Sequence, residues 1–167
     1  MLRLIKPDET MKEEIQSYNK AWEDRGIKLI PYAARLKMLS FEEWLMSTRD
    51  LETAAEESFV TQEVWFLFDG YTIVGACTLR HSLNADLLRM GGQIGYGVHP
   101  EKRRKGYATF MLQEMLKYAR ERGLKRVLVT CTAGNTASQK TIEKCGGILE
   151  NMIEVGADQI ARYWFQL

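Results

Sequence analysis

The stretch that decides the fold is Val98-His99-Pro100-Glu101-Lys102-Arg103-Arg104-Lys105-Gly106-Tyr107-Ala108. In it an apolar strand runs into four consecutive cations, a glycine and the start of a helix. A helix N-terminus leaves backbone N–H groups unpaired and carries about half a positive charge. A glycine at that point lets an anionic ligand approach the backbone closely. The stretch therefore predicts a site for a phosphorylated cofactor, with a solvated run of charge as the alternative.

Length and composition limit what surrounds this site. The chain has 167 residues, 46% of them hydrophobic and 27% charged, so we expect residues 1–167 to form a single domain with its own core. The 23 Lys and Arg residues nearly balance 22 Asp and Glu residues, which does not indicate a nucleic-acid-binding surface. The sequence contains no apolar segment suited to a signal peptide or a membrane span, so we expect a cytoplasmic protein without a membrane partner.

The cysteines do not suggest a metal site or a disulfide framework. They are three in number, an odd count, and lack the spacing of metal ligands. Their neighbours are apolar, which favours reduced thiols in the core. These residues are Cys77, Cys131 and Cys145.

The N-terminal third is predicted to be mostly helical. A short strand at 2–5 is followed by Asp8, which can cap a helix ending near Gly26. The segment 27–39 has no clean periodicity, and Ser40 to Glu43 forms a capping box that opens a second helix. The first helix is expected to bury residues at helical spacing, namely Met11, Ile15, Tyr18 and Trp22.

The central part predicts antiparallel strands. Strands at 64–68 and 71–79 are joined by Asp69-Gly70, a strong hairpin signal. A polar connection around Asn84 leads to a strand at about 93–98.

The C-terminal part adds helices and strands on either side of a crossover. A helix runs from about Ala108 to Gly123, and a buried strand follows at 127–129. A helix beginning at Asn135 and closing strands at 149–155 and 160–165 complete a mixed α/β domain with one β-α-β crossover. A dinucleotide-binding fold is the rival, but Gly95-Tyr96-Gly97 lacks the third glycine of that motif.

These motifs resemble those of the GNAT superfamily of acetyl-CoA-dependent N-acetyltransferases. The cofactor signature of that family is Arg or Gln, two residues, Gly, one residue, then Gly or Ala, and residues 103–108 match each fixed position. Upstream Val98-x-Pro100 and downstream Asn135 with Glu143-Lys144-x-Gly146 also match. The runs at 80–84, 91–97 and 162–164 are similar to one bacterial branch of predicted acetyltransferases.

The resemblance implies a largely antiparallel central sheet with helices on both faces and a splayed strand pair that holds acetyl-CoA. The gap would open between the strand ending at Val98 and the strand at Val127. The pantetheine arm would pair with backbone groups there, and the pyrophosphate would bind the backbone N–H groups that follow. The implied cofactor residues are Gly97, Val98, Arg103, Arg104, Lys105, Gly106, Tyr107, Ala108, Thr109, Asn135, Ser138 and Lys140.

Three of these assignments have structural alternatives. Asn135 can serve as a helix N-cap alone, and Ser138 can be an ordinary first-turn residue. Gly97, together with Gly95, can mark a β-bulge in its strand.

The usual proton-transfer groups of the family are absent from this chain. Acetyl transfer needs a neutral amine, and deprotonating one of pKa about 10.4 costs about 4.6 kcal/mol at neutral pH. A leaving thiolate of pKa about 8.5 costs only about 2 kcal/mol. The family often has a glutamate and a tyrosine for these tasks, where this chain has Gln93 and Ile142.

Other residues are candidates for these roles. The candidates are His81, Tyr96 and Tyr163, with Glu154 more remote. A histidine suits the role of base, although a structural histidine is an equal alternative, and Tyr163 fits a core or interface aromatic better than a catalytic group. Cys131 or Cys145 could in principle form an acyl-enzyme, but their apolar surroundings favour inert thiols. Direct transfer in a ternary complex is therefore the predicted mechanism, with the backbone N–H near Val98 as oxyanion donor.

Two functional hypotheses follow. The first is an N-acetyltransferase acting on a primary amine of a small molecule or peptide, with an acceptor site near Pro31-Tyr32 and residues 81–84. The second is a non-catalytic acyl-CoA-binding or sensory module, because the usual acid and base are missing. The aromatic end 163–165 could form a homodimer interface.

Overall fold

The computed structural model describes residues 1–53 and 60–167. The strands are β1 (Leu2–Ile5), β2 (Gln62–Asp69), β3 (Thr72–Arg80), β4 (Ile94–Val98), β5 (Arg126–Thr132), β6 (Ile148–Val155) and β7 (Asp158–Gln166). The α-helices are α1 (Lys12–Glu23), α2 (Phe41–Thr53), α3 (Ala85–Arg89), α4 (Tyr107–Glu121) and α5 (Thr136–Lys144). Short 3₁₀ turns are η1 (Glu9–Met11), η2 (Tyr32–Ala34) and η3 (Pro100–Lys102).

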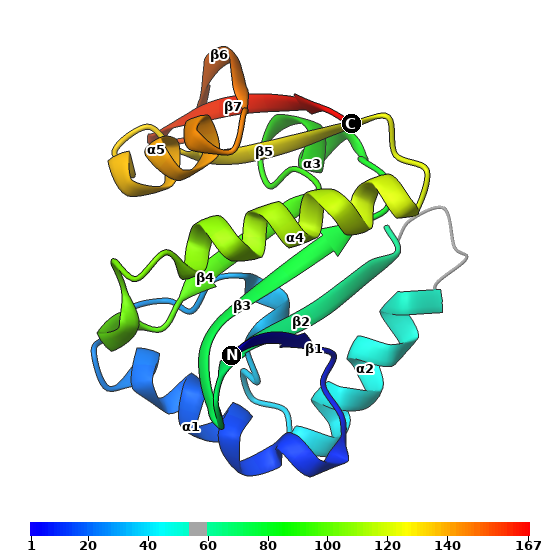
Figure 1. Ribbon diagram of the computed structural model, residues 1–167, viewed down its shortest axis with the longest axis vertical. Coiled ribbons are helices and arrows are strands. Elements are labelled where there is room, and N and C mark those ends of the chain that lie inside the picture. Colours follow the sequence, from blue (N-terminus) through cyan, green and yellow to red (C-terminus); the bar gives the residue numbers. More distant parts are fainter. Residues whose placement is uncertain (54–59) are drawn as a thin grey trace.

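The strands form two antiparallel sheets, which Figure 1 shows one above the other. The first has the order β1-β2-β3-β4 and the second has the order β5-β7-β6. The chain passes from the first sheet to the second through β4, α4 and β5, which is the predicted crossover. The mixed, largely antiparallel α/β class predicted from the sequence is thereby confirmed.

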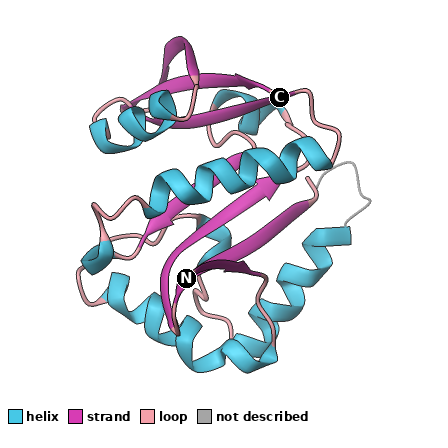
Figure 2. Ribbon diagram, viewed as in Figure 1, coloured by secondary structure: helices cyan, strands magenta, loops and turns pink. Residues whose placement is uncertain are grey.

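Helices cover both faces of the first sheet, as predicted (Figure 2). Helix α4 packs on β3 and β4, whereas α1 and α2 pack on β3 and β2 from the other face. Two buried clusters result, one on each face. No described helix has the length and apolar character needed to cross a membrane.

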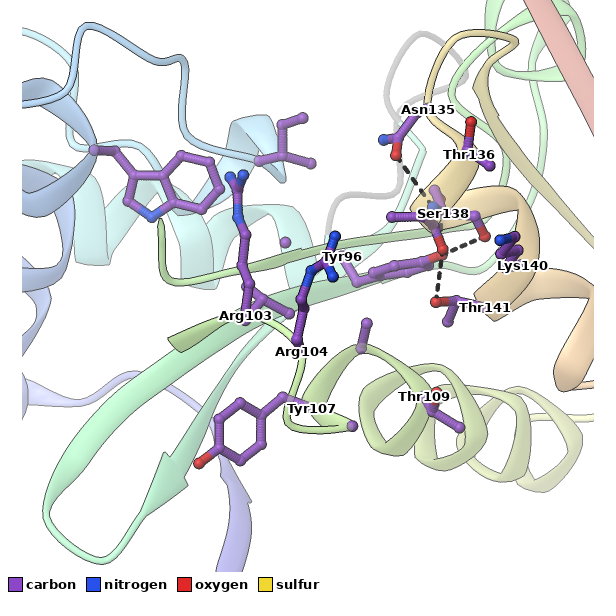
Figure 3. A pocket seen from close by; sticks show the side chains of 17 residues that line it. Tyr96, Arg103, Arg104, Tyr107, Thr109, Asn135, Thr136, Ser138, Lys140 and Thr141 are labelled. Carbon is purple, nitrogen blue, oxygen red and sulfur yellow. Dashed lines mark hydrogen bonds between the residues drawn. The ribbon is translucent and has the colours of Figure 1, made fainter. Parts of the chain in front are cut away.

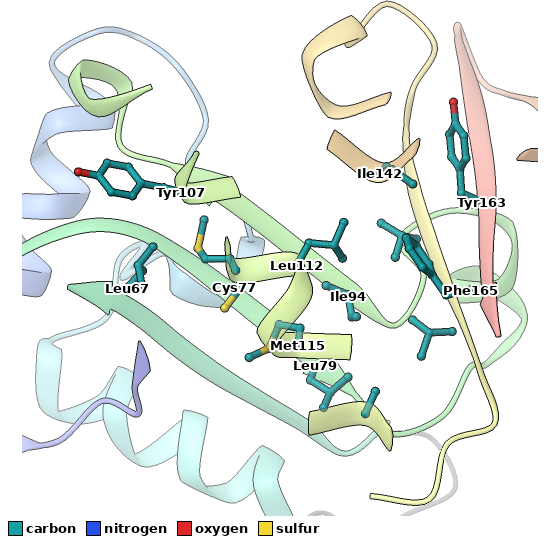
Figure 4. Close-up of a cluster of buried hydrophobic side chains, with 14 of the residues drawn as sticks. Leu67, Cys77, Leu79, Ile94, Tyr107, Leu112, Met115, Ile142, Tyr163 and Phe165 are labelled. Carbon is teal, nitrogen blue, oxygen red and sulfur yellow. The ribbon is translucent and has the colours of Figure 1, made fainter. Parts of the chain in front are cut away.

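The apolar stripe of α4 lies at the centre of the larger cluster (Figure 4). Met111, Leu112 and Met115 are fully buried there, in a cluster that also holds residues of β3 and β7. Burial raises the pKa of the Cys77 thiol in this cluster, so the thiol stays protonated, which agrees with its predicted core role.

The predicted helix starts in the N-terminal third are confirmed. The Asp8 side chain accepts a hydrogen bond from the Thr10 N–H at 2.8 Å and caps η1, which leads into α1. The capping box before α2 is complete, because the Ser40 N–H donates to Glu43 and the Glu43 N–H donates to the Ser40 hydroxyl.

The connection after β3 differs from the sequence prediction. Residues around Asn84 were expected to be a polar connection, but the Asn84 side chain accepts from the Leu87 N–H and caps helix α3. This helix has five residues and none of them is buried. It therefore leaves no apolar periodicity in the sequence by which it could be recognised.

The two sheets meet at Gln93 and diverge from there. The Gln93 N–H donates to the Leu128 carbonyl, and the Gln93 side-chain oxygen accepts from the Leu128 N–H, each at 2.8 Å. Gly92 has φ +62°, and a Cβ there would lie 2.4 Å from the Leu128 oxygen. Along the rest of β4 the described residues form no ladder to β5. The predicted splayed strand pair is confirmed, and Gln93 joins its closed end.

Candidate active site

A cavity of about 870 Å³ lies between β4, the start of α4 and the start of α5 (Figure 3). All the predicted cofactor residues line it except Lys105. Segments far apart in the sequence thus meet at one site. The full lining is Trp22, Ile30, Tyr96, Gly97, Val98, Arg103, Arg104, Gly106, Tyr107, Ala108, Thr109, Asn135, Thr136, Ala137, Ser138, Lys140 and Thr141.

The N-terminus of α4 opens into this cavity. Gly106 is the N-cap at φ +82°, and none of the described side chains caps the helix. A Cβ at Gly106 would have no atom within 4 Å, so the space beside it is open. Arg104 also has a left-handed φ, of 64°. The turn therefore leaves the first N–H groups of α4 free for an anionic ligand, since the helix itself provides them no partner.

The cavity wall is positively charged. Arg103, Arg104 and Lys140 line it, and no Asp or Glu within residues 1–53 and 60–167 belongs to the lining. The Arg103 guanidinium lies 5.6 Å from the centre of the Trp22 ring, which places this charge at the wall formed by α1. A cavity with three cations and a free helix N-terminus suits a polyanionic ligand.

The wall formed by α5 combines capping with cavity lining. The Asn135 side chain accepts from the Ser138 N–H at 3.1 Å, so Asn135 is the N-cap of α5 and also faces the cavity. The hydroxyls of Ser138 and Tyr96 are 2.8 Å apart (Figure 3). Burial raises the pKa of Tyr96 to about 12, although the hydrogen bond with Ser138 opposes this shift. The Tyr96 phenol therefore stays protonated at neutral pH and can donate a hydrogen bond.

The two glycines of β4 do not mark a bulge. The β3–β4 pairing is continuous from Leu79–Ile94 to Gly75–Val98. A Cβ at Gly97 would instead lie 2.0 Å from the Ile30 carbonyl oxygen, so the glycine is needed because the α1–α2 connection crosses β4 there. The bulge alternative was wrong.

His81 is held outside this cavity by a buried carboxylate. Its Nε2 lies 2.8 Å from Glu63, which also contacts Lys6 at 2.8 Å and Arg122 at 2.6 Å. Burial by itself raises the pKa of Glu63, but the hydrogen bonds from these three partners outweigh it and lower the pKa to about 2. The structure thus gives His81 a partner in an ion cluster and does not bring it to the cavity.

This cluster predicts acid sensitivity. The pKa of Glu63 is about 2 in the folded protein against an ordinary value of 4.5, so its stabilising effect is complete above about pH 4.5 and is lost toward about pH 2. We expect the urea midpoint to fall over this range. Glu63→Gln should lower the urea midpoint at neutral pH and weaken its dependence on pH between about 4.5 and 2. If the midpoint of the variant still falls as steeply with pH, Glu63 is not the cause of the acid sensitivity.

Tyr163 also lies away from the cavity. It is 1% exposed, and its hydroxyl donates to Glu143 at 3.1 Å and to Gln139 at 3.3 Å. Burial and the hydrogen bond to Glu143 raise its pKa to about 12. Tyr163 therefore joins β7 to α5. Ile142, at the family's usual tyrosine position, is fully buried in the same core.

The two remaining cysteines have structural surroundings. Burial raises the pKa of Cys131 and of Cys145, so neither is activated as a thiolate. The Cys145 thiol lies 3.9 Å from the Thr109 carbonyl oxygen. Neither residue is part of the cavity lining, which supports the prediction of inert thiols.

Some lining residues were not predicted from the sequence. Trp22 was assigned to the core stripe of the first helix and is indeed 3% exposed, yet it also lines the cavity. Ile30 comes from the α1–α2 connection, whose sequence has no periodicity that could place it.

Known proteins match this chain in sequence and in fold. The family model described as "Acetyltransferase (GNAT) domain" matches residues 2–148. The curated "Uncharacterized N-acetyltransferase YjdG" of Bacillus subtilis is 37% identical over 60 residues, which cover 35% of this chain and 36% of that protein. The match thus spans about a third of the relative's length.

Solved structures show the same fold at low identity. A ribosomal-protein-S5-alanine acetyltransferase from Vibrio fischeri superimposes with a TM-score of 0.75 and 13% identity over 99% of this chain and 92% of that one. The microcin C7 self-immunity acetyltransferase MccE, in complex with acetyl-CoA and AMP, superimposes with a TM-score of 0.73 and 17% identity, over 99% of this chain and 92% of that one. With the family model covering most of the chain, this protein belongs to the GNAT acetyltransferase family.

Proposed function

We propose that this protein is an acetyl-CoA-dependent N-acetyltransferase that acts on a primary amine of a small molecule or peptide by direct transfer in a ternary complex. The observation that carries the proposal is the cavity itself. Its wall combines three cations, the free N-terminus of α4 and the unpaired edge of β4. These are the elements needed to hold a phosphorylated thioester in extended form.

The residues present fit acetyl-CoA. The N–H groups of Tyr107, Ala108 and Thr109 would bind the pyrophosphate, assisted by Arg103 and Arg104. The free edge of β4 would pair with the amides of the pantetheine arm as a missing strand would. The related folds of MccE and of a Salmonella acetyltransferase named yncA were solved with acetyl-CoA, which supports this choice of co-substrate.

Proton handling at this site would depend on Tyr96 and water. In the part of the chain that the structure describes, neither a carboxylate nor a histidine lines the cavity, so the amine proton would leave through ordered water. Tyr96 is the residue among the three sequence candidates that reaches the cavity. Its protonated phenol would donate a hydrogen bond to the developing thiolate as coenzyme A departs, and the thiolate would then take its proton from water. His81 and Tyr163 would act in the structure of the protein.

The decisive experiment separates an enzyme from a binding module. Acetyl-CoA binding is measured by calorimetry, and free thiol release is measured with a panel of small amines and N-terminally free peptides. We expect binding together with turnover of at least one amine. Binding without turnover above hydrolysis for every amine would support the non-catalytic module, and absence of binding would reject both functions.

Tyr96→Phe tests the proposed hydrogen-bond donor. Because thiolate departure costs only about 2 kcal/mol at neutral pH, losing the phenol should lower kcat by at most about 30-fold. The affinity for acetyl-CoA should change little. Tyr163→Phe, which removes a similar hydroxyl outside the cavity, is the matched control and should retain kcat; equal losses in both variants would assign the effect to folding.

A further inference from the structure

A second cavity, of about 280 Å³, lies beside the first. It is formed by the C-terminal half of α1 and by residues 26–29, 35 and 37 of the α1–α2 connection. The function proposed above does not use it.

The second cavity is basic. Lys28, Arg35 and Lys37 line it, and Glu23 is its acidic lining residue. Among the ion pairs of the described ranges 1–53 and 60–167, none involves these three cations. Their charges are therefore available to a ligand. The Glu23 carboxylate reduces the net positive charge of the cavity.

Contacts within the connection hold two of these cations in place. The Arg35 Nε donates to the Leu29 carbonyl at 2.6 Å, and its guanidinium lies 4.8 Å from the centre of the Tyr32 ring. The Lys37 ammonium lies 3.7 Å from the centre of the same ring. Cation–π contacts of this kind restrict both side chains without neutralising them, so the charges are ordered before any ligand binds.

The basic cavity and the active-site cavity share one lining residue. Trp22 lines both of them. Ile30, which belongs to the same connection as the three cations, lines the active-site cavity. A molecule whose amine reaches the active site along this connection would therefore bring its neighbouring groups to the basic cavity.

Resting on the proposed function, we propose that the basic cavity binds an anionic group of the acceptor, either a carboxylate or a phosphate, close to the amine that is acetylated. The phosphates of the co-substrate already have a site at the N-terminus of α4, with its own arginines. Lys28, Arg35 and Lys37 lie on the α1–α2 connection instead. We therefore assign them to the acceptor. The acceptor class is thus an acidic amine or a peptide with an acidic N-terminal segment.

The test uses three short peptides with a free N-terminus that differ only at their second and third residues. These residues are glutamine in the first peptide, glutamate in the second and phosphoserine in the third. We expect kcat/KM for one or both acidic peptides to exceed that for the neutral one by about tenfold or more. The glutamate and phosphoserine arms distinguish a carboxylate site from a phosphate site.

Lys28→Gln combined with Lys37→Asn should reduce this ratio at least about fivefold. Asparagine suits position 37 because it tolerates the left-handed φ of 57° found there. The control loses two charges elsewhere, through Lys117→Gln and Lys125→Gln, and should keep the ratio. A missing preference, or one that the first pair of substitutions leaves intact, would overturn the proposal.

A direct binding measurement keeps the result clear if no peptide is acetylated. Calorimetry measures the affinity of each of the three peptides for the protein in the presence of coenzyme A. No acetyl group is transferred in this experiment, so the affinities test the basic cavity independently of catalysis. If an acidic peptide binds more tightly than the neutral one, and Lys28→Gln with Lys37→Asn abolishes this difference, the anion site stands even though the enzymatic function fails. Equal binding of all three peptides would reject the site, whatever the outcome for acetyl-CoA.

Discussion

Gly106→Val is expected to weaken acetyl-CoA binding by about a hundredfold or more. Gly106 has φ +82°, a conformation that a β-branched residue adopts only with strain. Its missing Cβ faces open space in the cavity, so the valine side chain would occupy the place assigned to the pyrophosphate. A hundredfold change corresponds to about 2.8 kcal/mol, which is within reach of losing phosphate contacts to the helix N-terminus. Calorimetry with acetyl-CoA measures the change.

The same helix offers a matched control at its other end. Gly123 follows α4 with φ +79°, and a Cβ there would also have no neighbour within 4 Å. Gly123→Val therefore imposes similar backbone strain on α4 without reaching the cavity. It should lower the free energy of unfolding about as much as Gly106→Val and leave the affinity for acetyl-CoA unchanged. Equal affinities in the two variants would mean that the phosphates bind elsewhere.

The part of the cavity wall that begins at Val98 was predictable because its determinants are local in sequence. A strand end, a run of cations, a glycine and an amphipathic helix are consecutive from Val98 onward, and their geometry follows from helix and turn chemistry. Asn135 could be found in the same way, because an N-cap is encoded within one helical turn. The structure brings these two segments to one cavity.

The places of the candidate catalytic residues could not be predicted in the same way. A side chain at the end of a strand reaches the cavity only if it lies at the open end of the splayed pair. The local sequence does not indicate which end is open. His81 follows β3 at the end that pairs with Gln93, which is the closed end, whereas Gly75 pairs with Val98 at the open end. Tyr163 likewise faces α5 through long-range packing. Tertiary contacts therefore decided the roles of these two residues.

Gln93→Leu is expected to lower the free energy of unfolding by about 2–3 kcal/mol and to weaken acetyl-CoA binding at least about tenfold. The Gln93 side chain is 5% exposed and accepts the hydrogen bond of the Leu128 N–H. Leucine has similar volume and no acceptor, so it would leave a buried backbone donor unpaired, at a cost of about 1–3 kcal/mol. Because this contact joins the closed end of the strand pair, its loss should also change the width of the gap. Urea denaturation and calorimetry measure the two effects.

Two further variants test whether Gln93 serves to join β4 to β5 or stands in the place of a catalytic base. Leu45→Ala removes a buried side chain from the cluster on the opposite face of the sheet and should cost about 2–5 kcal/mol without affecting cofactor affinity. Gln93→Glu restores the glutamate that the family often has, and its carboxylate can still accept from the Leu128 N–H. Since residue 93 is not part of the cavity lining, this substitution should not raise kcat. A clear gain in kcat, with a new pH dependence in the range of a carboxylate, would show that the position serves proton transfer and that the contact with Leu128 is secondary.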